Sequence, residues 1–355
     1  MRMLPSSEIQ IYEGIDDVLF ERWLQLYERS SEKTFFQHPS WTKVWLSSKS
    51  RENVRVCCLF VDDRLEILTP LRIESASRCV ISGNEHTDYN MILVGEGSEG
   101  HLQTFLAWIG KQFGTIVVSE IPKASIQASS LANLRTVFRD EVTHCPRIDL
   151  LDFNHVQDLL SKKSTNRKTK MLYNAGEVRV EHTQELEKIG GRLSEFIDLH
   201  IERWKATASP SMFRDDSSVR LYQGLIENCV PLVWSGLYLD DELVAGHIGI
   251  VDRKSLLWYK PAYSTSHSKL SPGEILLREV IRYAIENNYH SLDFTRGDEP
   301  YKYRYANLTM ANENLVICRR RIHSIGLLAH SELLRQARRV RSKVQILVGR
   351  RTSLE

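Results

Sequence analysis

The clearest pattern along the chain is an alternating apolar strand, a pair of aspartates and a second apolar strand. It occurs as LFVDDRL at residues 59–65 and again as LYLDDEL at residues 237–243. Period-two alternation is typical of a strand, and two acidic turn residues between such runs predict a β-hairpin. The first aspartates, Asp62 and Asp240, are 178 positions apart (240 − 62), which is about half of the chain. This spacing indicates an internal duplication.

The apolar periodicity predicts the same order of elements in each half. For the second half we expect three strands, a helix and a fourth strand, at residues 232–239, 242–251, 255–263, from 271 onward and 290–294. The offset places the counterpart helix and strand of the first half near residues 100–113 and 115–119. A further helix is expected at residues 193–206, beyond a break at Gly190-Gly191.

The start of the helix at residue 271 is the first candidate for chemistry. Ser271 is suited to be its N-cap, Pro272 falls at the first helical position, and Glu274 completes an S-x-x-E capping box. The free N–H groups of a helix start attract anions. Ser271, Gly273, Glu274 and Ile275 are therefore our candidates for holding a phosphorylated cofactor, although a well-capped helix needs no ligand.

The polar loop after the strand at 290–294 is the second candidate. Asp293 ends the strand, and the run TRGDEPYKYRY at residues 295–305 alternates rings and cations near its end, which we interpret as an extended segment. A carboxylate beside an attacking ammonium can accept its proton, and a cation beside a thioester carbonyl can stabilise the oxyanion. Asp293 or Asp298 is the candidate base, and Lys302 or Arg296 the candidate oxyanion cation. A surface ion-pair network is the alternative interpretation.

Composition and charge narrow the class of protein. The 355 residues are 42% hydrophobic and 26% charged, which is typical of a globular protein with room for two domains. No apolar run is long enough for a signal peptide or a membrane span, and no Walker A, HExxH or GxSxG motif occurs. Six cysteines without CxxC spacing indicate buried reduced thiols and a cytoplasmic location. No pattern predicts a metal site.

Positive charge is concentrated at the end of the chain. From residue 319 onward there are ten Lys/Arg against Glu332 and Glu355, a charge of about +8, so the rest of the chain carries about −6 of the net +2. An apolar stripe from Leu333 to Leu347 predicts a basic amphipathic helix that contacts a membrane surface or a partner protein, or packs on its own domain. A second basic run, at residues 161–170, is either a solvated connector or a cationic wall for a phosphorylated substrate. Basic charge confined to these segments argues against nucleic-acid binding.

The motifs at residues 271–273 (SPG) and 293–304 (DFTRGDEPYKYR) resemble the CelD-like (cellulose-biosynthesis) group of GNAT-fold acyltransferases. These are relatives of the FemABX peptidyltransferases, with two GNAT-like domains in tandem. The aromatic run FFQHPSWTKVW at residues 35–45, Asp88-Tyr89 and CPRIDL at residues 145–150 are also similar to landmarks of that group.

The resemblance implies an α/β fold of tandem GNAT-like domains with mixed sheets flanked by helices. We assign residues 1–155 to a degenerate first domain that shapes the acceptor cleft, residues 156–318 to the catalytic domain and residues 319–355 to the basic tail. The activity implied is transfer of an acyl group from acyl-coenzyme A, with acetyl-coenzyme A expected, to an amine of a sugar nucleotide, polysaccharide precursor or similar small acceptor. Lys302 is similar in place to the lysine of the F-K motif in the Fem relatives.

Six further residues are candidates for holding the acceptor: Asp88, Tyr89, Arg203, Trp204, His247 and Tyr301. Asp88 and Tyr89 fall in a loop, which favours recognition. His247 is more often a core histidine in such a strand, and helix-end packing explains Arg203-Trp204 as simply as acceptor binding does. Two other functions stay open: an aminoacyl-tRNA-dependent transferase of Fem type, and a non-catalytic scaffold in envelope or exopolysaccharide assembly.

Overall fold

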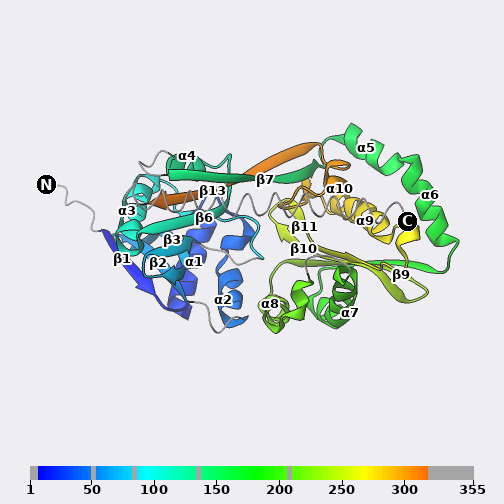
Figure 1. Ribbon diagram of the computed structural model, residues 1–355, viewed down its shortest axis with the longest axis horizontal. Coiled ribbons are helices and arrows are strands. Elements are labelled where there is room, and N and C mark those ends of the chain that lie inside the picture. Colours follow the sequence, from blue (N-terminus) through cyan, green and yellow to red (C-terminus); the bar gives the residue numbers. More distant parts are fainter. Residues whose placement is uncertain (1–6, 49–52, 82–85, 133–136, 206–209, 319–355) are drawn as a thin grey trace, which may run out of the picture.

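The computed structural model describes residues 7–48, 53–81, 86–132, 137–205 and 210–318. Its strands form one continuous sheet in the order β1-β2-β3-β4-β6-β13-β7-β12-β11-β10-β9-β8, and β5 pairs with β3 (Figure 1). Helices cover the sheet at both ends of the molecule. The mixed α/β architecture expected from the sequence is confirmed. The basic tail predicted at residues 319–355 lies outside the described residues.

Both halves repeat one order of elements. The first half holds β1 (Ser7–Tyr12), α1 (Asp17–Arg29), α2 (Pro39–Ser48), β2 (Val54–Val61), β3 (Arg64–Ser75), β4 (Arg78–Ile81), β5 (Leu93–Val94), α3 (Leu102–Phe113), β6 (Thr115–Pro122), α4 (Ile126–Ala132) and β7 (Val137–Asp149). Helices α5 (Phe153–Ser161) and α6 (Lys163–Tyr173) connect the halves. The second half holds β8 (Val178–Thr183), α7 (Leu186–Trp204), α8 (Asp216–Glu227), β9 (Leu232–Leu239), β10 (Glu242–Asp252), β11 (Ser255–Tyr263), α9 (Pro272–Glu286), β12 (Ser291–Asp293), α10 (Pro300–Tyr303) and β13 (Leu308–Cys318).

The two Asp-Asp hairpins predicted from the sequence are present. Strands β2 and β3 meet at the pair Val61↔Arg64, and strands β9 and β10 meet at Leu239↔Glu242. All four turn aspartates have a positive φ, between 48° and 64°. Aspartate tolerates this left-handed conformation better than most residues, and a turn of this hand matches the twist of the strands.

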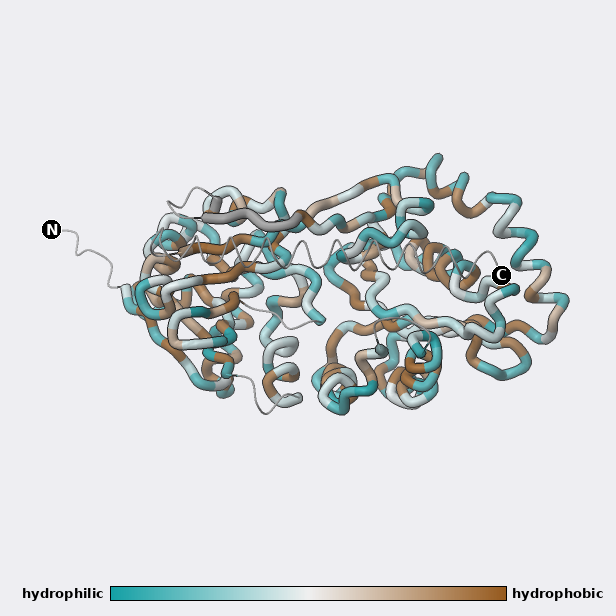
Figure 2. The backbone as a smooth tube through the Cα atoms, viewed as in Figure 1, coloured by the Kyte–Doolittle hydropathy of each residue, from teal (hydrophilic) through white to brown (hydrophobic). Residues whose placement is uncertain are grey.

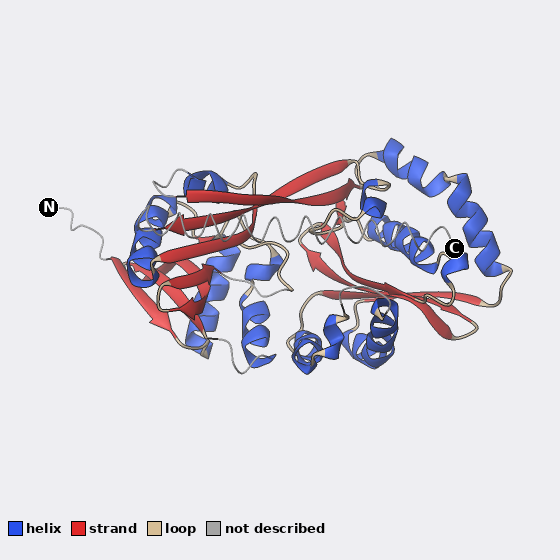
Figure 3. Cartoon of the chain, in the orientation of Figure 1, coloured by secondary structure: helices blue, strands red, loops and turns tan. Residues whose placement is uncertain are grey.

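The last strand of each half crosses into the other half. Strand β13 lies between β6 and β7, and the end of β7 pairs with β12 through Arg147↔Asp293. Figure 3 shows β7 and β13 as long strands running across the top of the molecule between the two halves. The halves are therefore joined through the backbone hydrogen bonds of one sheet.

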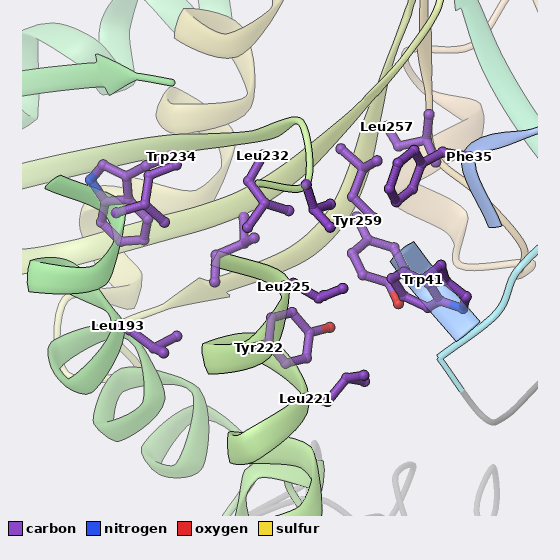
Figure 4. Packing of buried hydrophobic residues seen from close by; sticks show 14 of the residues in the cluster. Phe35, Trp41, Leu193, Leu221, Tyr222, Leu225, Leu232, Trp234, Leu257 and Tyr259 are labelled. Carbon is purple, nitrogen blue, oxygen red and sulfur yellow. The ribbon is translucent and has the colours of Figure 1, made fainter. Parts of the chain in front are cut away.

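A shared core also joins the halves. The aromatic run predicted as a landmark forms a short 3-10 turn and helix α2, whose Phe35, Phe36 and Trp41 are buried. They belong to one hydrophobic cluster with Tyr222 of α8 and Tyr259 of β11. Figure 4 shows Trp41 and Phe35 beside Tyr259, with Tyr222 and Leu225 on the adjoining helix.

Two local predictions were wrong. Helix α7 runs through Gly190 and Gly191 without a break, because burial of Leu193 and Phe196 offsets the roughly 1 kcal/mol that each glycine costs a helix. The segment after Glu299 is not extended. It forms helix α10 with Pro300 at its first position, which buries Lys302 and leaves Tyr303 exposed.

Within the described residues, no helix is both long and apolar enough to span a membrane. The hydropathy-coloured tube in Figure 2 is brown mainly along the inner strands and along α9. Five of the six cysteines are buried as free thiols, as expected, whereas Cys229 is exposed.

Candidate active site

The second half opens where strands β11 and β12 separate. Their parallel pairing covers only Ser255↔Ser291 to Leu257↔Asp293, while β11 continues to Tyr263 alongside β10. A β-bulge in β11, where Trp258 and Tyr259 lie opposite Gly249 of β10, and the positive φ of Thr295 turn the two strands apart. Among the described strands, none pairs with residues 258–263 on the side of β12. This edge offers backbone donors and acceptors to an extended ligand.

Helix α9 begins just beyond that edge, but its capping box is not formed. Ser271 has a left-handed backbone (φ 56°, ψ 47°) and makes no side-chain cap bond, so the prediction of a Ser271–Glu274 capping box was wrong. Glu274 instead accepts hydrogen bonds from Lys168 (2.6 Å) and Thr165 (3.4 Å) on α6. Ile275 is buried in the core, so only its backbone faces the helix start.

Aromatic and cationic side chains border this helix start. Gly273 lies against the ring of Tyr263: a Cβ added at Gly273 would approach the ring to 2.9 Å. The guanidinium of Arg203 lies 4.5 Å from the centre of the same ring, within cation–π range. The basic run at residues 161–170 forms the end of α5 and most of α6, and its Lys168 reaches Glu274 of α9. Positive charge therefore adjoins the start of α9 on two sides.

Asp293 is buried and fully bonded at the junction of the halves. It accepts hydrogen bonds from the Tyr89 hydroxyl (2.8 and 2.9 Å), the Thr295 N–H (2.8 Å) and Arg147 (2.5 Å). Burial and the Asp293 charge raise the pKa of Tyr89, which keeps its hydroxyl protonated as the donor. Tyr89 is thus placed on the interface between the halves, with its hydroxyl directed at Asp293 instead of at solvent.

Arg296 connects the loop between β12 and α10, residues 294–299, to the first half. Its Nε lies 2.7 Å from Asp88, and its Nη1 lies 3.7 Å from Glu120. Asn312 of β13 donates to the Asp88 carbonyl (2.9 Å) and to Glu120 (3.2 Å). Asp88 is therefore buried in an ion-pair network and not exposed in an open loop.

Lys302 is held inside the loop, with only 4% of its surface exposed. Its ammonium donates to the Arg296 carbonyl (2.8 Å) and lies 2.9 Å from Glu299. Gly297, at φ 124°, brings the backbone close to both side chains. The positive charge is consequently fixed in place, as electrostatic stabilisation of a developing oxyanion requires.

Asp298 is exposed, as is Glu299 beside it, which pairs with Lys302. The Tyr303 hydroxyl donates to Asp298 at 2.5 Å, and His144 of β7 lies 3.0 Å away. The hydrogen bond from Tyr303 lowers the pKa of Asp298, and the same contact raises the pKa of Tyr303 to about 12. Asp298 is thus ionised at neutral pH and reachable from solvent.

The other acceptor candidates are scattered. His247 is fully buried, stacks on Trp258 and accepts a hydrogen bond from the Tyr259 N–H (3.2 Å); burial lowers its pKa to about 3. It is a neutral core histidine, so its selection as an acceptor contact is corrected. Trp204 stacks on His200 at the end of α7, and Tyr301 lies half-buried against Phe294.

Sequence reasoning missed several residues of this site, including Arg147, His144 and Glu120. Arg147 was present in the CPRIDL motif, and its period-two position with Cys145 could have placed both on one face of β7. The partners of Glu120 could not be found, because Arg296 and Asn312 come from the other half of the chain.

Residues 161–303 match the sequence profile of the acetyltransferase (GNAT) domain. The described fold is also similar to three solved structures. FemX shares 11% sequence identity, with a TM-score of 0.60, over 90% of this chain and 99% of that one. L-PGS from Bacillus licheniformis shares 12% sequence identity, with a TM-score of 0.59, over 91% of this chain and 98% of that one. A tandem GNAT protein from the clavulanic acid biosynthesis pathway shares 10% sequence identity, with a TM-score of 0.54, over 87% of this chain and 98% of that one.

No curated protein matches the sequence. The fold is therefore of the tandem GNAT type, and the protein is an acyltransferase whose second half carries the GNAT acetyltransferase domain. The described residues contain no cluster of His, Cys, Asp and Glu able to hold a metal ion.

Proposed function

We propose that this enzyme transfers an acyl group from acyl-coenzyme A to the amine of a small acceptor such as a sugar nucleotide or polysaccharide precursor. The observation that carries the proposal is the separation of β11 from β12 directly before the start of α9. The pantetheine amides of the donor would bond to the edge of β11, and its pyrophosphate would lie at the N–H groups around Gly273. The tandem GNAT protein from the clavulanic acid biosynthesis pathway, whose structure was solved without AcCoA, supports a coenzyme A donor.

The equivalent opening of the first half is occupied by its own chain, which supports a single donor site. Asn90 donates through its N–H to the Glu120 carbonyl (2.9 Å) and through its side chain to the Ser119 carbonyl (2.8 Å), at the end of β6. Residues 86–91 are buried there. We assign the first half to shaping the acceptor side, with His144 beside Asp298 as its contribution.

In the proposed reaction the acceptor nitrogen attacks the thioester carbonyl carbon, and the carbon–sulfur bond then breaks. Asp298, directly or through water, would take the proton that the nitrogen loses, because its oxygens face solvent while those of Asp293 are already bonded. Lys302 would stabilise the oxyanion as a fixed charge, with Arg296 holding the loop against Asp88 and Glu120. The thiolate of coenzyme A leaves and is protonated by water.

The experiment is release of the coenzyme A thiol from acetyl-coenzyme A in the presence of a panel of amino sugars and sugar nucleotides. The wild-type protein should release thiol only with an amine acceptor present, and Lys302→Met should lower kcat by more than about tenfold. Lys188→Met, an exposed lysine on α7, is the matched control and should retain the rate.

Transfer from an aminoacyl-tRNA with no thiol release would replace this proposal with a Fem-type reaction. A protein that turns over neither donor would favour a scaffold. An unchanged rate in Lys302→Met would remove Lys302 from the mechanism.

A further inference from the structure

Large apolar side chains are exposed where β13 begins and where β7 turns into α5. Leu151 and Phe153 are 67% and 72% exposed, and Leu308 is 45% exposed. Asn307 ties the two segments together: its Oδ1 accepts from the Asp149 N–H (2.8 Å) and its Nδ2 donates to Asp152 (3.1 Å). Leu151, Phe153 and Leu308 form what we call the apolar patch. Tyr303 of α10 and Met310 of β13 are also exposed.

Helix α6 presents a line of cations to solvent. Its buried side chains, Thr165 and Leu172, define the inner face. Lys163, Arg167 and Lys170 follow at intervals of four and three residues, so they lie on the opposite face of the helix, and all three are exposed. Among the described residues none of these three is in an ion pair, and α6 contains no acidic residue. We call these three residues the cationic stripe.

Leu151 and Phe153 of the patch and the three cations of the stripe belong to one continuous segment, from the end of β7 through α5 and α6. Val156 and Leu159 of α5 and Leu172 of α6 are buried in one hydrophobic cluster, which also contains α9. The outer faces of α5 and α6 are therefore both turned away from that cluster. Figure 1 shows the two helices as an outer arm beyond α9, and in Figure 2 the outer parts of this arm are largely hydrophilic. Asp158 is the exposed acid of α5, and Asp152 is engaged by Asn307 and the His155 N–H.

We propose that this arm and the apolar patch dock onto an anionic membrane surface. Lysine and arginine near such a surface are attracted to anionic headgroups, and apolar side chains beside them insert at the acyl boundary. A nucleic-acid backbone would engage the stripe but offers nothing to Leu151, Phe153 and Leu308. The proposal does not depend on the donor or the acceptor of the reaction. Its residues do not include the basic tail at residues 319–355.

The experiment is co-sedimentation of the full-length protein with vesicles of phosphatidylcholine alone or of equal parts phosphatidylcholine and phosphatidylglycerol. The wild-type protein should bind the anionic vesicles preferentially. The triple variant Lys163→Gln, Arg167→Gln, Lys170→Gln should bind them at least about tenfold more weakly. The control Lys111→Gln, Lys188→Gln, Lys254→Gln removes the same charge from exposed sites elsewhere and should bind like wild type. The tail is present in every variant, so any vesicle binding by the tail is the same on both sides of each comparison.

A second variant separates insertion from charge. Leu151→Ser with Phe153→Ser keeps the net charge and should weaken binding at high salt, where the electrostatic part is screened. Circular dichroism should show all variants folded. Equal binding by the stripe variant and its control would overturn the proposal, as would binding of a single-stranded RNA oligonucleotide through the stripe without binding to vesicles.

Discussion

At the level of single residues, the two candidate bases, Asp293 at the end of β12 and Asp298 in the following loop, differ in how their oxygens are used. Asp293 is 1% exposed and meets Tyr89, Arg147 and the Thr295 N–H. Asp298 is exposed and meets Tyr303 and His144. From the sequence alone the two were equivalent candidates for the base. A linear motif shows neither the burial of a side chain nor its partners from the other half of the chain.

Replacing Asp293 should therefore mainly affect stability. In Asp293→Asn the half-buried Arg147 guanidinium loses its counter-charge, and we expect the free energy of unfolding to fall by about 2–3 kcal/mol. Urea denaturation measures this. Asp298→Asn is the matched control: its exposed carboxylate should change stability by less than about 1 kcal/mol. Equal small effects for both variants would contradict the structural role of Asp293.

Two buried histidines give the stability a defined pH dependence. Burial lowers the pKa of His247 from 6.5 to about 3, and burial together with Lys260 and Arg203 lowers that of His200 from 6.5 to about 4. In this range the unfolded chain binds protons that the folded protein does not. Their contribution to stability is therefore complete above pH 6.5 and is lost as the pH falls below it, at up to about 1.4 kcal/mol per pH unit for each histidine.

Denaturant unfolding between about pH 7 and pH 4.5 measures this slope. His200→Gln, which removes one of the two groups, should make the slope shallower by about 1.4 kcal/mol per pH unit. A stability that rises on acidification, or a slope unaffected by the substitution, would show that these histidines are protonated in the folded protein.

Among the helices and strands, the sequence predicted those elements whose form depends on neighbouring residues along the chain. The Asp-Asp hairpins, the three-strand meander and α9 follow from apolar periodicity and turn residues. The edge strands β1 and β8 were missed, because their side chains are largely exposed or half-buried and carry little apolar alternation. The capping box is not formed, because Glu274 pairs with Lys168, which lies over 100 residues earlier in the chain.

The position of β13 could not be predicted from either half alone. Its pairing with β6 and β7 joins residues that are far apart in sequence, and periodicity does not encode which edges meet. The result is a sheet in which each half completes the other.

This exchange of strands predicts that the two halves unfold together. Without β13, the edges of β6 and β7 would be open and the shared cluster around Trp41 and Tyr259 exposed. Differential scanning calorimetry should show one transition with matching calorimetric and van't Hoff enthalpies. Two separate transitions would mean that the halves are independent folding units.

For the molecule as a whole, the two halves share one order of elements but differ in their openings. In the first half Asn90 fills the end of β6 from within the chain. In the second half β11 and β12 separate in front of α9, flanked by Arg203 and α6. The sequence motifs placed the candidate donor site in the second half, next to that opening. They could not show that Tyr263 lies against Gly273, which only the fold brings about.

The most direct test is calorimetric titration of acetyl-coenzyme A into the purified protein and one matched pair of glycine variants. A Cβ at Gly273 would press on the Tyr263 ring, whereas a Cβ at Gly191 meets nothing within 4 Å. We predict saturable heat at one site for the wild type and for Gly191→Ala, and affinity at least about tenfold weaker for Gly273→Ala. Absence of heat for the wild type, or equal affinity for the two variants, would contradict a donor site at the start of α9.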